Sequence, residues 1–367
     1  MKLGAAGAAF AAATSAVAEE HSLELGARGQ RVDIANVETD VVGIDATYYF
    51  PPIDDARGPY SLAPFLSRSS RVTVAVHRDV ETTTITSSSP FTGPSTIVLD
   101  TETEGGSIFG RYVLRPSGWY AGGNYQVSGG GPPPSTLTRT DVDVDGYGLH
   151  VGKYLSASTS LEIGWDSTES TIESIFSGCI SYPICQPLGG THISEITAEE
   201  ASVRVFHVGD VGRLSYSVSG RAASRRTDRR ILLLDPVQDF VLPFGPPAAI
   251  GTLPERPNVA IVSNPPVFGV GPVAGGINPV PNPPPIGRIQ TYSAAGAVFP
   301  TASLSVGVGY SRWDGDRALD DAYDVSVGWF FLRNAAARVR FSRTNRTIAI
   351  DALNEVDDIS LRLTGRF

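Results

Sequence analysis

Polar and apolar residues alternate along most of this chain, in segments of about 10 residues that suit a β-strand with two unlike faces. In the last segment, residues 359–367, isoleucine, leucine and phenylalanine take odd positions, while serine, threonine and arginine take even ones. Successive side chains of a strand point to opposite faces, so this segment has one apolar face and one cationic face. A helix would scatter both sets around its circumference. The pattern therefore predicts strands.

The same alternation recurs between turn-rich connections and gives about 14 strands, or 12 to 16 if a proline-rich segment is misread. Short connections follow the fourth, sixth, eighth, tenth and twelfth strands, and long connections follow the third, fifth, seventh and ninth. The connection over residues 51–70 departs from this rule, because it is too long for a tight turn. The clearest alternating segments are 44–50, 71–77, 119–127, 161–166, 213–221, 303–310, 323–331 and 336–342.

Two long stretches interrupt the alternation. Residues 79–106 are rich in threonine and serine and are predicted to form a polar loop. Residues 228–287 hold most of the prolines together with apolar pieces such as Ile231–Leu234. Disorder favours low hydrophobicity, so we expect this insertion to form a structured loop that covers or enters one mouth of the fold.

These strands need a closed sheet if they cross a membrane, because every backbone amide in hydrocarbon requires a partner. The prediction is an all-β fold, a closed antiparallel transmembrane up-and-down β-barrel. The alternative is a soluble sandwich, which would bury its aromatic residues in a dry centre and carry fewer arginines on the opposite faces. Aromatic residues instead end the apolar faces, as in the interfacial girdles of membrane proteins: Tyr48, Phe50, Trp119, Tyr125, Trp165, Trp329, Phe331 and Phe367.

The C-terminal segment resembles the closing strand of Gram-negative outer-membrane β-barrels, whose terminal aromatic is read by the insertion machinery. On that resemblance Leu361, Leu363 and Phe367 form the membrane-insertion signal. Residues 58–70, GPYSLAPFLSRSS, are similar to a connection found in one group of porins. The resemblance implies the outer membrane of a Gram-negative bacterium, with outer-membrane lipid, lipopolysaccharide and the barrel-assembly machinery as partners.

The N-terminus fits export. Lys2, a small apolar run over residues 3–13 and Ala-Val-Ala at 16–18 predict a signal peptide over residues 1–18. Residues 19–367 then form the barrel, with the insertion 228–287. The oxidising periplasm favours a disulfide between Cys179 and Cys185.

The strand faces opposite the apolar ones would line the interior. Their arginines either set a field that favours anionic solutes or brace the wall by pairing with carboxylates, and both readings stay open. The formal net charge of −9 argues against a nucleic-acid surface. The candidate pore-lining and selectivity residues are Arg204, Arg213, Arg221, Arg338, Arg340, Arg362, Arg366, Glu162, Asp166, Asp45 and Asp324.

Other chemistry has weak support. Asp141, Asp143 and Asp145 match the opening of a calcium loop, but its twelfth position would be Gly152, so no metal site is expected beyond this weak candidate. The five histidines lie in no nucleophile motif, and an enzyme is not expected.

The sequence favours a porin-like channel, free of cofactors, for passive diffusion of small hydrophilic, anionic solutes. The alternatives are a non-conducting surface barrel, serving as an adhesin or structural anchor, and a lipid hydrolase using His207.

Overall fold

The computed structural model describes residues 20–34, 37–54, 58–89, 93–131, 138–179, 187–234, 287–315, 319–347 and 353–367. Fourteen strands account for most of them, which confirms the expected number. No helix in these ranges is long and apolar enough to cross a membrane. The strands are β1 Glu20–Ile34, β2 Val37–Asp54, β3 Ser70–Ser89, β4 Gly93–Leu114, β5 Trp119–Gly131, β6 Thr138–Tyr154, β7 Thr159–Cys179, β8 Pro187–Val211, β9 Leu214–Leu234, β10 Gly287–Thr301, β11 Leu304–Gly315, β12 Leu319–Leu332, β13 Ala335–Thr347 and β14 Leu353–Arg366.

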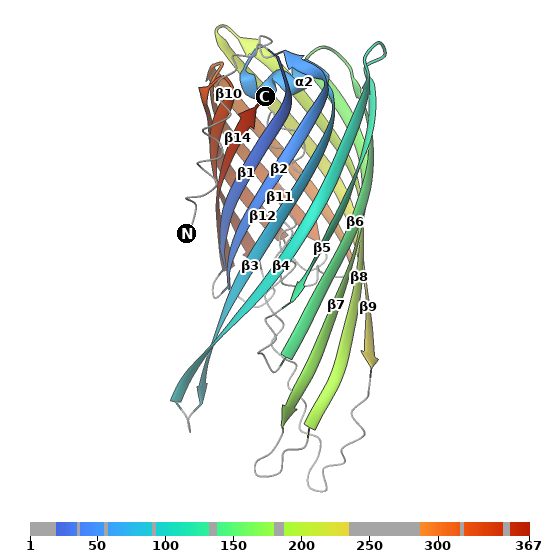
Figure 1. Cartoon of the computed structure of the whole chain (residues 1–367), viewed down its shortest axis with the longest axis vertical. Helices are drawn as coiled ribbons and strands as arrows, with labels where there is room; N and C mark the ends of the chain where they lie inside the picture. The colour runs from blue at the N-terminus through green and yellow to red at the C-terminus, as the bar shows by residue number, and fades with distance from the viewer. Residues whose placement is uncertain are drawn as a thin grey trace.

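Each strand pairs antiparallel with its neighbours in sequence, and β14 pairs with β1 to close the sheet (Figure 1). The closing register runs from Glu24 opposite Arg366 to Ile34 opposite Val356. Phe367 extends this seam, because its amide donates to the Leu23 carbonyl at 2.8 Å. The predicted closed up-and-down barrel is confirmed.

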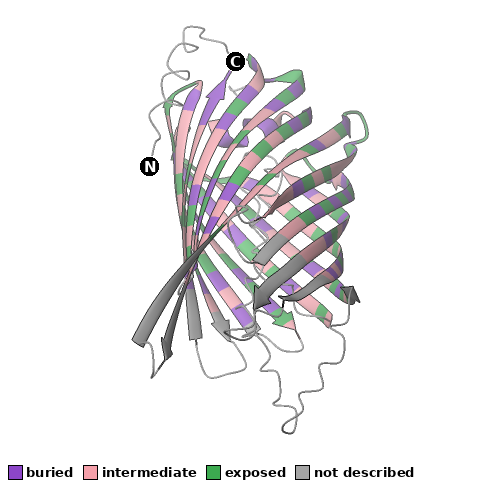
Figure 2. Ribbon diagram, turned by 60° about the horizontal axis from the view of Figure 1, so that its bottom comes forward, coloured by how far each residue is buried: buried purple, intermediate pink, exposed green. Residues whose placement is uncertain are grey.

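The apolar stripes point outward and the ionic stripes inward, as the alternation predicts. Leu361, Val339 and Trp329 are 36%, 47% and 56% exposed on the outer wall. Glu24 and Arg366 face inward and are almost completely buried. Figure 2 shows the result as bands of exposed and buried residues along the strands. A hydrocarbon-facing exterior and an ionic interior follow from this arrangement.

One group of exposed aromatic side chains lies on the outer wall close to the short turns. Trp329 packs edge-on against Phe331, with ring centroids 5.9 Å apart. Trp119 lies at the start of β5, and the Lys153 ammonium is 5.1 Å from its ring. Such rings favour the boundary between lipid and water, so they mark one edge of the membrane-embedded band.

Five short turns lie at one end of the barrel, together with the C-terminus and the short helix α2 (Figure 1). They span residues 115–118, 155–158, 212–213, 302–303 and 333–334. Short turns face the periplasm in outer-membrane barrels, so this end is the periplasmic one.

The prediction of a polar loop over residues 79–106 is wrong. β3 continues to Ser89, β4 begins at Gly93, and the ladder between them is continuous up to the pair Ser89–Gly93. Threonine favours strands, and a sheet that extends beyond lipid has water on both faces. The parts of β3 and β4 beyond the lipid therefore have no alternating apolar residues, although their backbones remain hydrogen-bonded to each other.

The proline-rich insertion was predicted to begin at Asp228, but the strands around it are longer than expected. β9 continues to Leu234, and β10 starts at Gly287. The rest of the proline-rich insertion, residues 235–286, lies outside the described residues, as does the predicted signal peptide. Cys179 ends β7, whereas Cys185 also falls outside the described part, so the disulfide stays a prediction.

Candidate functional site: the lumen and its plug

Ion pairs between strands line the inner wall. Arg362 on β14 donates to Asp45 at 2.8 Å, and Arg340 on β13 donates to Asp324 at 3.3 Å. In another part of the wall, Arg204 on β8 donates to Glu162 on β7 at 3.2 Å, and Arg221 on β9 pairs with Glu200 on β8. These side chains are between 7% and 28% exposed, so bulk water screens them less than it screens a surface pair.

In two of these pairs, Arg362–Asp45 and Arg340–Asp324, a glycine on a neighbouring strand makes room for the carboxylate. A Cβ atom at Gly26 would lie 2.4 Å from Asp45 Oδ1, and one at Gly309 would lie 2.1 Å from Asp324 Oδ2. Asp45 thus lies across β1 and reaches Arg362 on the strand beyond it. An inward glycine next to an inward acid is therefore part of how each pair forms.

Glu24 is an almost completely enclosed acid of the lumen. Its carboxylate lies 2.7 Å from Arg366 Nε and accepts a hydrogen bond from the Tyr49 hydroxyl at 2.9 Å, with His21 Nε2 at 3.2 Å. The side chains of Glu24 and Arg366 are each 2% exposed. The seam between β1 and β14 is thereby fixed by a buried charge network.

Ten of the eleven predicted pore-lining residues face the interior. Asp166 lies over Gly148, and Arg338 lies beside Gly328. Arg213 is the exception, because β8 and β9 are joined by a two-residue turn, Gly212–Arg213, and the arginine is exposed there. The prediction that Arg213 lines the lumen is wrong, because Arg213 belongs to the turn and β9 begins at Leu214, one residue later than the polarity pattern indicated.

Sequence reasoning did not single out two inward arginines, Arg71 on β3 and Arg111 on β4. They are direct partners in the ladder, although like charges in that position repel. Their guanidinium groups lie over aromatic rings, Arg71 at 5.3 Å from Phe109 and Arg111 at 5.1 Å from Tyr120. The Nε atom of each is buried without a hydrogen-bond partner. Neither guanidinium group is therefore paired with a carboxylate through its Nε atom.

The connection between β2 and β3 folds into the barrel and forms a plug, which we define as residues 58–69. It consists of the 3-10 turn η1, Tyr60–Leu62, the single-turn helix α2, Ala63–Leu66, and short flanks. Gly58 and Arg68 have φ angles of 91° and 47°, so the chain turns sharply at both ends. The plug lies within residues 51–70, the connection that the sequence already showed to be too long for a tight turn.

Apolar contacts fix one side of the plug. Phe65 packs against Phe206 on β8 and Tyr154 on β6, with ring centroids 4.5 and 5.3 Å apart. Leu62 is completely buried, and a leucine withdrawn from water contributes about 1.5–3 kcal/mol. Its cluster contains Val208 on β8 and Ala295, Ala297 and Phe299 on β10.

The opposite side of the plug faces the wall formed by β11–β14, and its contacts there are fewer and more polar. The Tyr60 amide donates to Ala302 at 3.0 Å, and Arg366 donates to the Tyr60 carbonyl at 3.0 Å. The Tyr60 ring packs edge-on against Phe330 at 5.5 Å.

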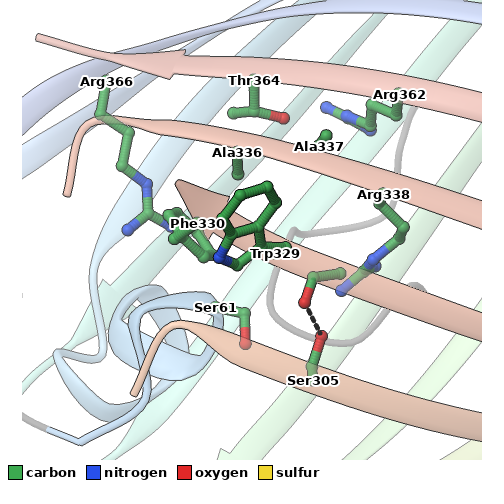
Figure 3. Close-up of a pocket in the computed structure, with 11 residues that line it drawn as sticks. Ser61, Ser305, Trp329, Phe330, Ala336, Ala337, Arg338, Arg362, Thr364 and Arg366 are labelled. Carbon is green, nitrogen blue, oxygen red and sulfur yellow. Dashed lines mark hydrogen bonds between the residues drawn. The ribbon is translucent and has the colours of Figure 1, made fainter. Parts of the chain in front are cut away.

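A pocket remains between the plug and this wall (Figure 3). Figure 3 shows the Arg338 guanidinium extending toward Ser305 and Ser61. The pocket is lined by Ser61, Ser305, Gly328, Trp329, Phe330, Ala336, Ala337, Arg338, Arg362, Thr364 and Arg366.

The weaker sequence candidates lie away from the lumen. Asp145 is exposed on the outer face of β6 and accepts a hydrogen bond from the Tyr125 hydroxyl at 3.0 Å. Asp141 and Asp143 precede it on the same strand. Across the described residues no three His, Cys, Asp or Glu side chains are grouped to hold a metal ion.

His207 lies at the outer wall near the periplasmic end, with Nδ1 2.9 Å from the Thr159 hydroxyl oxygen. Its other nitrogen, Nε2, is 3.4 Å from the Tyr216 hydroxyl, so both ring nitrogens lie near hydroxyl groups, whereas in a hydrolytic triad a carboxylate accepts from Nδ1.

Comparison with known proteins finds outer-membrane barrels among solved structures. Omp33 of Acinetobacter baumannii shares 14% identity with a TM-score of 0.48, covering 95% of this chain and 99% of that one. A deletion mutant of TodX, described as a monoaromatic hydrocarbon channel, shares 11% identity with a TM-score of 0.53, covering 95% and 91%. The TodX toluene transporter of Pseudomonas putida shares 10% identity with a TM-score of 0.49, covering 95% and 89%.

No family model and no curated protein matches the chain. At these identities the structural likeness concerns the fold. It agrees with the closed sheet, the apolar outer wall and the ionic interior described above. The chain is a closed antiparallel β-barrel that has the fold of Gram-negative outer-membrane barrels.

Proposed function

We propose that this barrel is a channel for passive diffusion of small hydrophilic, anionic solutes across the outer membrane. The observation that carries the proposal is the inward orientation of arginines around a closed, lipid-facing wall. Short side chains separate them, among them Ser305, Gly307 and Ser326, and leave room for solute. Fixed positive charges in a low-dielectric passage attract anions.

The two readings of these arginines apply to different residues. Arg204, Arg221, Arg340 and Arg362 pair with carboxylates, so they brace the wall and each pair is neutral overall. Selectivity then depends on other inward arginines, among them Arg71 and Arg111, which lie side by side near the plug, and Arg338 beside the pocket at the plug. The solved relatives that carry channel names are consistent with a transport role, and this role is our inference for the present chain.

Planar lipid bilayers test the proposal. The purified protein should give discrete open steps, and a salt gradient should produce a reversal potential of the sign expected for anions. Reversing two lumen charges, Arg338→Glu with Arg340→Glu, should shift the reversal potential toward cation selectivity. An unchanged potential would assign both arginines to bracing.

A folded protein that stays silent in the bilayer at every voltage would contradict the channel proposal. Folding is checked on a gel, because an intact barrel migrates differently before and after boiling. Silence with an intact barrel would favour the adhesin or anchor alternative. Lipid hydrolysis that is lost in His207→Ala would favour the enzyme.

A further inference from the structure

We propose that solutes pass the plug on one side only, through the pocket between Ser61 and the β11–β14 wall. Arg338 and Arg362 select them there for a carboxylate or another small oxyanion. This inference rests on the proposed channel function and identifies the stretch of the lumen that determines selectivity.

The first argument is the unequal attachment of the plug. Leu62 and Phe65 are enclosed by side chains of β6, β8 and β10, and a solute on that side would have to separate buried apolar surfaces. Toward β11–β14 the plug is attached through two hydrogen bonds to main-chain oxygens and one ring contact. Contacts of this kind can be exchanged for water at low cost.

The second argument is the shape of the β11–β14 wall. Its inward positions next to the plug carry short side chains, Ser305, Gly328, Ala336 and Thr364. They leave a cavity of about 30 Å³ between wall and plug, which is open to solvent on one side. Beside the contacts of Tyr60, wall and plug are therefore separated by this cavity.

The third argument is the chemistry of the lining. Arg362 already donates to Asp45, but its Nε is buried without a hydrogen-bond partner. Arg338 extends into the pocket from the adjacent strand, and Ser61 presents a hydroxyl group there, while the Ser305 hydroxyl donates to the Gly328 carbonyl at 3.3 Å (Figure 3). Guanidinium and hydroxyl donors match a carboxylate, and a solute held by them would remain hydrated on its open side.

Thiol labelling distinguishes the two sides of the plug. Cys179 and Cys185 are first replaced by serine, and one cysteine is then introduced at Ser305 on β11 or at Ala297 on β10. Both are small, inward-facing residues at similar depth, but Ser305 lines the pocket and Ala297 lies in the Leu62 cluster. An anionic methanethiosulfonate reagent is added on both sides of a bilayer.

Labelling S305C should reduce the conductance roughly twofold or more, and A297C should keep it. Equal block of both variants, or block of A297C alone, would overturn the one-sided path while leaving the channel proposal intact. A parent protein without conductance would overturn both.

A charge-matched pair gives an independent readout. Arg338→Gln should lower the anion-to-cation permeability ratio roughly twofold or more, because it removes a donor from the passage. Arg225→Gln removes the same charge from the opposite wall, on β9, and should leave the ratio near that of the parent. Equal shifts in both variants would mean that the whole lumen, rather than the pocket, selects the ion.

Discussion

Single residues of the lumen differ in how much each charge matters to the fold. Glu24 and Arg366 are a buried pair at the seam that closes the barrel. Arg343 and Asp357 form an outer pair of comparable geometry, at 2.8 Å, but are 46% and 42% exposed. Desolvation makes a buried charge costly once its partner is lost, whereas water takes over the role of a partner at the surface.

Glu24→Gln should destabilise the barrel by about 3–5 kcal/mol, because the Arg366 guanidinium remains buried without its carboxylate. Asp357→Asn removes the same type of charge at the surface and should cost about 1 kcal/mol or less. Urea unfolding in detergent micelles, followed by tryptophan fluorescence, measures both. Similar losses in the two variants would show that the Glu24 network does not hold the seam.

Sequence alone predicted which face most lumen residues occupy, but not their partners. The inward direction of Arg362 and Asp45 follows from alternation within β14 and β2, which is local information. Their contact is set by the register of three strands, between residues separated by 317 positions. The repelling pair Arg71–Arg111 likewise appears only when β3 and β4 are aligned.

At the scale of elements, the strands were predictable and the plug was not. A strand in a lipid-facing barrel repeats every two residues, so each segment carries its own signal. Residues 58–69 have no such period, and a single helical turn is unstable in isolation. The conformation of the plug depends on the wall around Leu62 and Phe65, which is assembled from distant segments.

Replacing the plug, residues 58–69, by a short glycine-serine linker should raise the single-channel conductance roughly threefold or more, because an obstruction inside the lumen is removed. The matched control is Leu149→Ala, an exposed apolar residue of the outer wall that should leave conductance unchanged. Single-channel recording measures both variants after gel migration confirms folding.

An unchanged conductance in the folded linker variant would contradict this expectation. It would mean that the narrowest point lies elsewhere in the lumen. The one-sided path beside the plug would then lose its basis.

The whole molecule is arranged with its apolar surface outside and its charges inside. The outer wall carries Val, Leu, Ile and aromatic side chains around the barrel, and the interior holds the ion pairs and the plug. Closure of the sheet leaves no unpaired edge in the lipid. This arrangement was predictable, because it depends only on the alternation of faces and on the need to pair every amide.

The outer wall should tolerate charge according to its depth in the membrane. Val327 and Leu332 both lie on β12 and are 45% and 48% exposed, but Val327 is midway along the apolar stripe and Leu332 adjoins the periplasmic turn. Val327→Arg should cost about 2–4 kcal/mol of folding free energy, and Leu332→Arg about 0–1 kcal/mol. Urea titration of the protein refolded into lipid vesicles measures both. A larger cost at Leu332, or equal costs at the two sites, would mean that the membrane does not surround this wall in the way the apolar stripe indicates.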